Sequence, residues 1–420
     1  MSDSALDCSD IDRFLGKPMQ PARLKEPLAN NDIRRWAQAM HYPNQLHYDD
    51  EFAAESRYGR IVAPQSFAVC TDDGHGAGPA CVGTIPNSHL LFGGDEWWFH
   101  GPRIVAGDLI HNERIPFDYV VKQTKFAGPT CFQRGDNHYH NARGEKIATQ
   151  RSTSIRYRAD LARDAASSAA AAAAGSDPDW TDAQIAELEK QKLEYIDALH
   201  ALGHGKRYWD DVKVGDKLPQ RVFGPHSVAS FATEWRAYIF TTWGGMHRRT
   251  DLDLAALGFT ADMAGHEGDP VVEKQNPELT DGAYYGPSRG HLFPRWARYI
   301  GMPRAYGYGA SMGAWMIDYF AGWAGEWGRV VHSNCNYRGP AFTGDVTIMT
   351  AGVVDKLLDD QGRPVVQVDC KMANQLGTTL ATSVGEPYPS FVLRCAGCRP
   401  GIGPWSHASC GARSEYCNCV

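Results

Sequence analysis

The sequence repeats one order of motifs on either side of an alanine-rich segment at residues 165–175, and this repeat limits the fold more than any other feature. Each copy contains, in order, a His-x-x-x-x-x-Ala motif, a Pro-led Gly-Asp pair and an Asn-x-x-Gly-x-x-x-Ala-Thr motif. These motifs begin at His47, Pro102 and Asn141 in the first copy, and at His291, Pro340 and Asn374 in the second. Any one match is weak, but the shared order indicates that one structural unit has been duplicated.

The length of the chain allows each copy to bury a core of its own. With 420 residues, of which 43% are hydrophobic, two globular units fit the chain better than one. A helix should begin after Thr181, because Gln184 completes a capping-box pattern with it. We predict a first domain at 1–160, an alanine-rich linker and connector helix at 161–205, a second domain at 206–388, and an unstructured Cys-rich tail at 389–420.

Two kinds of hydrophobic pattern indicate the fold class. Residues 346–354 and 364–370 alternate apolar and polar side chains, which is typical of half-buried antiparallel strands. Residues 310–323 are apolar nearly all round, as in a helix that other elements enclose. One long helix wrapped by an antiparallel sheet is the hotdog arrangement. The duplicated sequence therefore predicts an α+β double hotdog, with two antiparallel sheets that are each wrapped around a long central helix.

Charge and hydropathy argue against several classes of partner. The net charge of −7 is unfavourable for binding nucleic acid, which usually needs a basic face. No apolar run approaches the ~18–20 residues that span a bilayer, and the first ten residues lack a secretory pattern. We therefore expect a cytoplasmic protein with neither a nucleic-acid nor a membrane partner.

The tail at 389–420 contains residue types that could bind zinc. Cys395, Cys398, His407 and Cys410 have suitable donor atoms. The alternative is a Gly-, Ser- and Cys-rich tail with nothing to fix a tetrahedral geometry. We predict no metal site.

Parts of the first copy resemble a known family. Residues 36–53, which run into Gly-x-Ile-Val-Ala-Pro at 59–64, resemble the hydratase segment of MaoC-like proteins. Residues 133–145 and 150–157 resemble the strand pair of the acyl dehydratase branch, which is the FAS1-like dehydratase. The resemblance implies a lyase, an enoyl-CoA hydratase or 3-hydroxyacyl-CoA dehydratase, that adds water reversibly to a 2-enoyl-CoA with a bulky acyl group.

The same resemblance implies a site. The reaction needs a base for water, a proton for Cα and hydrogen-bond donors for the thioester oxygen. In the family an Asp and a His handle the water and the proton, and amides at the start of the buried helix bind the oxygen. By position, His47 matches the family histidine and Asn44 its asparagine, whereas Tyr42 replaces the Asp. A phenol is a poor base at neutral pH.

The second copy retains His291 but has lost the Asp and the Asn, so we place the chemistry in the first copy. The predicted catalytic residues are His47, Asn44 and Tyr42. The predicted substrate-binding residues are Ala63, Gln65, Ser66 and His291. The resemblance implies no cofactor beyond the acyl-CoA substrate, and a homodimer or a heteromer with another hotdog protein.

Because both copies lack the family Asp, two alternatives stay open. One is a non-catalytic acyl-CoA-binding subunit of a heteromeric MaoC-like hydratase. The other is a hotdog thioesterase.

Overall fold

The computed structural model describes residues 6–24, 26–71, 76–86, 88–166, 176–238, 277–280, 289–359 and 362–388. The tail at 389–420 lies outside the described residues, and so do its candidate zinc ligands and most of the alanine-rich segment. The tail and the domain boundaries therefore stay predictions.

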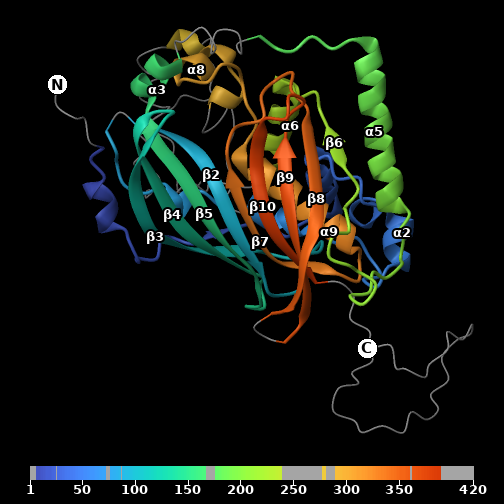
Figure 1. Ribbon diagram of the computed structural model, residues 1–420. Coiled ribbons are helices and arrows are strands. Elements are labelled where there is room, and N and C mark those ends of the chain that lie inside the picture. The colour runs from blue at the N-terminus through green and yellow to red at the C-terminus, as the bar shows by residue number, and fades with distance from the viewer. Residues whose placement is uncertain are drawn as a thin grey trace, which may run out of the picture. The chain divides into compact units, whose positions relative to one another are not determined.

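Ten antiparallel strands form one sheet among the described residues, in the order β1-β3-β4-β5-β2-β7-β10-β9-β8-β6 (Figure 1). The order is palindromic: each half of the chain contributes five strands in an equivalent arrangement, and β2 pairs with β7 at the centre. The strands are β1 Ala22–Arg23, β2 Ser88–Phe99, β3 His111–Thr124, β4 Gly128–His140, β5 Lys146–Arg158, β6 Arg221–Phe223, β7 Arg329–Tyr337, β8 Thr347–Leu358, β9 Pro364–Ala373 and β10 Thr379–Tyr388. This symmetry is what a duplicated unit predicts.

The repeated asparagine motifs make the same turn in both halves. The side-chain oxygen of Asn141 accepts hydrogen bonds from the amides two and four residues later, at 3.0 Å each. The side-chain oxygen of Asn374 accepts from the amides at the same two offsets, at 3.1 and 3.0 Å. An asparagine that fixes the backbone just after it is a common way to close a hairpin. The motif is therefore structural in both copies.

The predicted enclosed helix is present as α9 Gly309–Ala324. Nearly all of its side chains are buried, and it packs against β2, β7 and β10. Its first residue approaches β2 closely: a Cβ added at Gly309 would lie 2.7 Å from the Cβ of Phe92. A glycine at this position therefore lets the start of the helix lie against the sheet.

The first half has no equivalent of α9 in the described residues. The segment that follows Pro64 forms a 3-10 helix, η3 Gln65–Thr71, which packs against α9. Several glycines follow within residues 72–78, and each glycine in a helix costs about 1 kcal/mol relative to alanine. Within the predicted α+β layout, the two sheets are joined edge to edge through β2 and β7, and a long central helix is described in one half only.

The other helices lie around the sheet. They are η1 Ser9–Arg13, α1 Asn30–Ala39, η2 Gln45–His47, α2 Asp50–Glu55, η4 Gly78–Ala80, α3 Ala159–Ala166, α5 Asp182–His200, α6 Val228–Tyr238, η6 Pro277–Thr280, η7 Arg289–His291 and α8 Pro294–Tyr299. The predicted connector helix is α5, which lies along β6 (Figure 1). Its capping box is confirmed, because the amide of Gln184 donates to the Thr181 hydroxyl and the Thr181 amide donates back to the Gln184 side chain. None of the helices in the described ranges has the length and apolar character needed to span a membrane.

Candidate active site

The three residues that the sequence predicts as catalytic lie together in the first half. The rings of Tyr42 and His47 have their centroids 5.1 Å apart, and the Asn44 side chain donates to the Tyr42 hydroxyl at 3.0 Å. Nδ1 of His47 lies 2.7 Å from the carbonyl oxygen of Val62. Because a carbonyl only accepts, Nδ1 carries the proton and Nε2 is left as the acceptor. The structure brings these residues together, while their catalytic role stays a prediction.

The surroundings of this cluster keep it neutral. His47 is only 1% exposed, and its burial, together with the positive charge of Arg103, lowers its pKa to about 3. Burial also raises the pKa of Tyr42 well above its ordinary value. The Asn44 side chain also caps η2, because its oxygen accepts a hydrogen bond from the Leu46 amide. These contacts are those of a packed, hydrogen-bonded cluster.

Three of the predicted substrate-binding residues have polar groups that are bound within the protein. Gln65 exchanges two hydrogen bonds with the backbone of Val330, at 2.9 and 2.8 Å. The Ser66 hydroxyl donates to Asp318 at 2.6 Å. Both backbone groups of Ala63 are also bonded within the chain. Gln65 and Ser66 thus join η3 to β7 and α9 of the second half.

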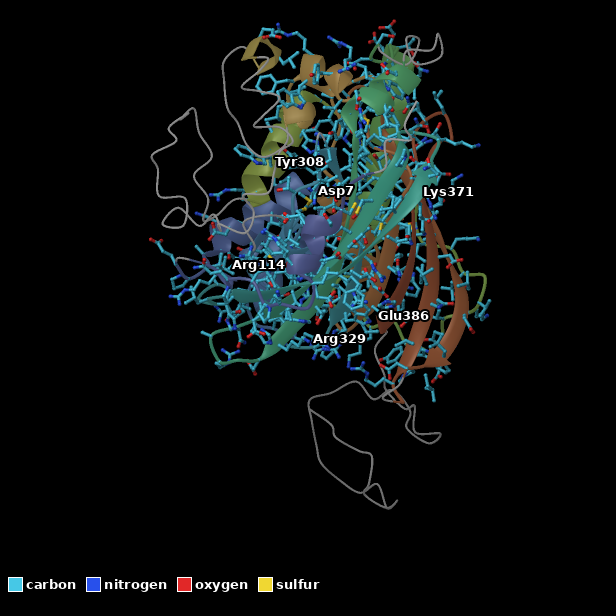
Figure 2. The ribbon with its side chains drawn as sticks, turned by 90° about the vertical axis from the view of Figure 1, so that its left-hand side faces the viewer. Asp7, Arg114, Tyr308, Arg329, Lys371 and Glu386 are labelled. Carbon is cyan, nitrogen blue, oxygen red and sulfur yellow. The ribbon has the colours of Figure 1, made fainter. Side chains whose placement is uncertain are left out.

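The fourth predicted substrate-binding residue, His291, lies in the second half beside the start of α9. Its Nδ1 is 2.6 Å from the carbonyl oxygen of Tyr306, which lies fifteen residues later in the sequence. The carbonyl that His47 contacts, that of Val62, also lies fifteen residues after its histidine. The His291 ring packs on Tyr308, with the ring centroids 3.7 Å apart. Tyr308 is the residue that precedes the first turn of α9, and Figure 2 shows it beside α6.

The amino end of α9 supplies hydrogen-bond donors. The amides of Gly309 and Ala310 open this helix, and the first amides of an α-helix have no acceptor within it. The helix dipole adds a partial positive charge at the same end. By contrast, η3 is a seven-residue 3-10 helix. Among the described residues, a histidine motif therefore meets the amino end of a long enclosed helix only at His291.

A buried carboxyl group faces the same end. Glu234 of α6 is 0% exposed, and neither of its oxygens has a hydrogen-bond partner of normal geometry in the described residues. Burial raises the pKa of Glu234 to about 8, and the neighbouring Ser311 hydroxyl partly offsets this rise. The charge of Glu234 also helps to raise the pKa of Tyr308, which places the two side chains near one another.

Sequence reasoning missed Glu234, although the sequence contains a signal. Phe231, Glu234 and Trp235 follow the spacing of one helix face, and all three are buried. A carboxylate between two aromatic residues on an apolar face is unfavourable unless it is neutral or has a partner. That conflict marks the position as one that does more than fill a core.

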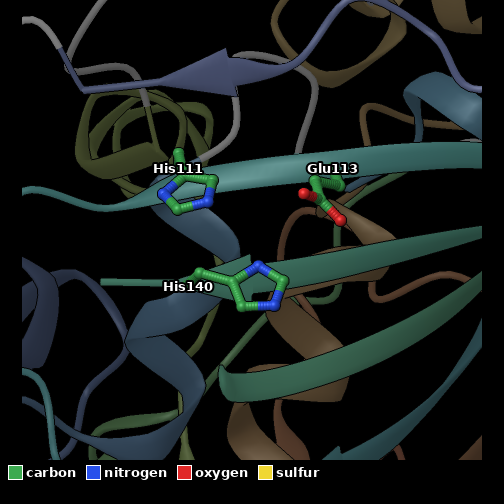
Figure 3. Close-up of side chains that lie close together, drawn as sticks. All are labelled: His111, Glu113 and His140. Atoms are coloured by element: carbon green, nitrogen blue, oxygen red, sulfur yellow. The ribbon is translucent and has the colours of Figure 1, made fainter. Parts of the chain in front are cut away.

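One group of side chains could hold a divalent cation. The ligand atoms of His111, Glu113 and His140 lie within 4.8 Å of one another on β3 and β4 (Figure 3). The two histidines are direct cross-strand partners. Their neighbour Tyr139 points into the core that contains α9, and side chains alternate between the two faces of a strand. This group therefore lies on the opposite face of the sheet and is separate from the end of α9.

Comparisons with known proteins give a family match for one third of the chain and a fold for most of it. Residues 13–150 match the family model described as the FAS1-like, dehydratase domain region. The chain is similar to a solved MaoC-like dehydratase, with 17% identity, a TM-score of 0.55, and coverage of 91% of this chain and 100% of the other. It is also similar to Rv0216, a conserved hypothetical protein from Mycobacterium tuberculosis described as a double hotdog fold, with 10% identity, a TM-score of 0.50, and coverage of 90% and 98%. No curated protein matched the sequence.

These matches confirm the fold class and the resemblance. The chain has the α+β double hotdog fold of MaoC-like dehydratases, and its residues 13–150 are similar to the FAS1-like dehydratase region. At these identities the solved structures establish the fold alone.

Proposed function

We propose that this chain is a hydratase or dehydratase that adds water reversibly to a 2-enoyl-CoA, and that the reaction takes place at the amino end of α9. The observation that carries this proposal is the position of His291, which packs on Tyr308 where α9 begins. The dehydratase region in the first half supports the reaction class.

The chemistry follows from the arrangement of groups around the helix end. Nδ1 of His291 donates to the Tyr306 carbonyl, so in the neutral ring Nε2 is the nitrogen that accepts a proton from water as the water oxygen bonds to Cβ. The electrons of the double bond move towards Cα, and negative charge builds on the thioester oxygen. The opening amides of α9 then stabilise that charge. A proton delivered to Cα completes the hydration.

This proposal moves the chemistry from the first copy, where the sequence predicts it, to the second. His47 has the same tautomer as His291, but it lies beside η3 instead of the end of a long helix. With the reaction confined to one half, the other half is available for a bulky acyl group. The first copy then contributes contacts that join the two halves.

The test compares Gln substitutions at the two equivalent histidines. His291→Gln and His47→Gln are assayed with a panel of enoyl-CoA thioesters, from crotonyl-CoA to long and branched acyl groups. We expect His291→Gln to lower kcat by about 100-fold or more, as is typical for loss of a general base. We expect His47→Gln to keep kcat close to that of the wild type. The reverse order would return the reaction to the first copy.

A second candidate function is a non-catalytic acyl-CoA-binding subunit, and the missing Asp in both copies favours it. In that case the purified chain is inactive with the whole panel and becomes active only with a partner hotdog protein. The oligomer, a homodimer or such a heteromer, is measured by light scattering before and after the partner is added. A thioesterase would be recognised by the release of free CoA thiol.

A further inference from the structure

The proposed reaction needs a second proton-transfer group. One group takes a proton from water at Cβ, and another must give a proton to Cα. In the first copy of the motif, Tyr42 occupies the position of the family Asp. The described part of the second copy provides His291 but no acidic residue within the motif.

We propose that Glu234, from a different element, is the group that transfers the proton at Cα of an enoyl-CoA thioester bound at the amino end of α9. This inference rests on the proposed function. Glu234 lies on α6, outside both copies of the histidine motif. It would be a catalytic residue of this chain that the motif does not contain.

The position of Glu234 fits this role. The residue is completely buried, and it lies next to Ser311 in the first turn of α9 and near Tyr308, which precedes that turn. Tyr308 in turn packs on His291. The carboxyl group, the imidazole and the opening amides of α9 are therefore parts of one cluster.

The bonding of Glu234 also distinguishes it from two other buried carboxyl groups, Asp95, which lies near α9, and Asp318, which lies on it. Asp95 accepts hydrogen bonds from Trp97, Tyr337 and Gln150. Asp318 has one oxygen bound by the Ser66 hydroxyl. Glu234 has only the Ser311 hydroxyl beside it in the described residues, and neither of its oxygens makes a hydrogen bond of normal geometry there. A buried carboxyl with so little hydrogen bonding is unfavourable for folding, so its retention is explained if a substrate supplies a further interaction.

The two groups begin in complementary states. Burial raises the pKa of Glu234 to about 8, so this carboxyl holds its proton at neutral pH. In the neutral form of His291, Nδ1 donates to the Tyr306 carbonyl and Nε2 is the nitrogen that accepts a proton. A protonated acid and an unprotonated base on one substrate are the combination that water addition requires.

The proposed step balances in atoms and electrons. A water O–H bond breaks, its proton goes to Nε2 of His291, and its oxygen bonds to Cβ. The double-bond electrons form a bond between Cα and the proton that Glu234 releases. Glu234 ends as a carboxylate and His291 as an imidazolium, and transfer of one proton between them restores both. Dehydration is the same sequence in reverse.

The experiment uses two substitutions of Glu234 and one matched control. Glu234→Gln keeps the shape of the side chain but cannot transfer a proton, and Glu234→Asp keeps the acid on a shorter stem. Asp318→Asn is the control, because it also neutralises a fully buried carboxyl group, which lies on α9 itself. Each variant is assayed for kcat and KM with crotonyl-CoA and longer enoyl-CoA thioesters. Exchange of the Cα proton of the 3-hydroxyacyl-CoA product with D2O is followed by NMR, and circular dichroism melts verify folding.

We expect Glu234→Gln to lower kcat and the rate of Cα exchange by about 100-fold or more with little change in KM. Glu234→Asp should restore part of both rates, and Asp318→Asn should leave both close to wild type. If His291→Gln abolishes hydration while Glu234→Gln does not, the proposed function stands and this inference is overturned. If the folded wild-type chain hydrates none of the thioesters, both fail.

Discussion

Equivalent histidines in the two halves show how one motif can serve different purposes. His47 and His291 each donate Nδ1–H to a carbonyl fifteen residues later, so the duplication preserves the ring orientation. Their surroundings differ, because His47 is held neutral beside Arg103, whereas His291 packs on the residue before α9. A motif in the sequence specifies this hydrogen bond but not the surroundings of the other ring nitrogen.

The ionisation of Glu234 predicts how activity depends on pH. If Glu234 is the acid in hydration, kcat should fall as pH rises through about 8, since the carboxyl then loses its proton. Among the described residues, its neighbours are Ser311 of α9 and Tyr308, which precedes α9, and beyond Tyr308 lie Tyr306 and His291. Steady-state kinetics across this pH range check the prediction. A kcat that stays constant as pH rises through about 8 would argue against Glu234 as the acid.

The same raised pKa predicts an effect on stability. Glu234 binds its proton more tightly in the folded protein, at a pKa of about 8, than in the unfolded chain, where the ordinary value is 4.5. Its contribution to stability is therefore fully present below pH 4.5 and is lost as pH rises towards about 8. Glu234→Gln should lose less free energy of unfolding across this range than the wild type. Urea unfolding curves at the two ends of the range measure the difference, and equal losses would contradict the prediction.

Ser66 tests the contact between η3 and α9. Its hydroxyl accepts from Trp36 and donates to Asp318, so Ser66→Ala leaves two buried polar groups without this partner. We expect the free energy of unfolding to fall by about 1–3 kcal/mol. Urea unfolding is compared with that of the exposed control Ser176→Ala, which should be unchanged. Equal stability of the two variants would mean that this chain of hydrogen bonds contributes little.

At the scale of elements, periodicity predicts what is regular and misses what depends on tertiary contacts. Residues 310–323 are apolar nearly all round and lie in α9, and the alternating residues at 347–354 and 364–370 lie in β8 and β9. The sequence also predicts a second long helix, where the structure has η3. Duplication alone does not preserve helix propensity, and the glycines at 72–78 reduce it.

The candidate site was predicted only in part, for a physical reason. His47, Asn44 and Tyr42 lie in one stretch of sequence, so their proximity follows from local structure. Glu234 comes near Ser311 and Tyr308 only through tertiary packing, in which α6 contacts η7, and no sequence spacing encodes that contact. Similarly, β2 and β7 pair through backbone hydrogen bonds. Every strand edge offers the same backbone groups, so the side chains do not indicate which two edges will pair.

The start of α9 provides a prediction about an element. A Cβ at Gly309 would lie 2.7 Å from the Cβ of Phe92 and 3.2 Å from its carbonyl oxygen, so Gly309→Ala must push α9 away from β2. We expect the substitution to cost about 1–3 kcal/mol of stability despite the better helix propensity of alanine. We also expect a lower kcat, since the opening amides would move. The control is Gly339→Ala, where the nearest atom to the new Cβ is 3.9 Å away. Similar melting temperatures for the two variants would contradict the close approach.

At the scale of the folded unit, the two halves share one sheet and one core. The β2–β7 pair joins them edge to edge, and a single buried cluster contains Trp36 and Tyr139 of the first half with Trp315 and Val366 of the second. Separating the halves would expose two strand edges and divide this core.

This continuity predicts cooperative unfolding. Tryptophan fluorescence and far-ultraviolet circular dichroism should give coincident urea transitions, because neither half can unfold while the other keeps its core. Two resolved transitions would show that the halves are independent domains, as the predicted boundaries imply. The two outcomes therefore also test those boundaries.

The central claim is that substrate binds where α9 begins, beside His291 and Glu234. The most direct measurement is a crystal structure of the chain with a 3-hydroxyacyl-CoA analogue in which a methylene group replaces the thioester sulfur, so that the carbonyl is kept. We predict that the carbonyl oxygen accepts a hydrogen bond from the amide of Gly309 or Ala310, with Cβ facing His291 and Cα facing Glu234. An analogue bound beside His47, away from the start of α9, would contradict the account.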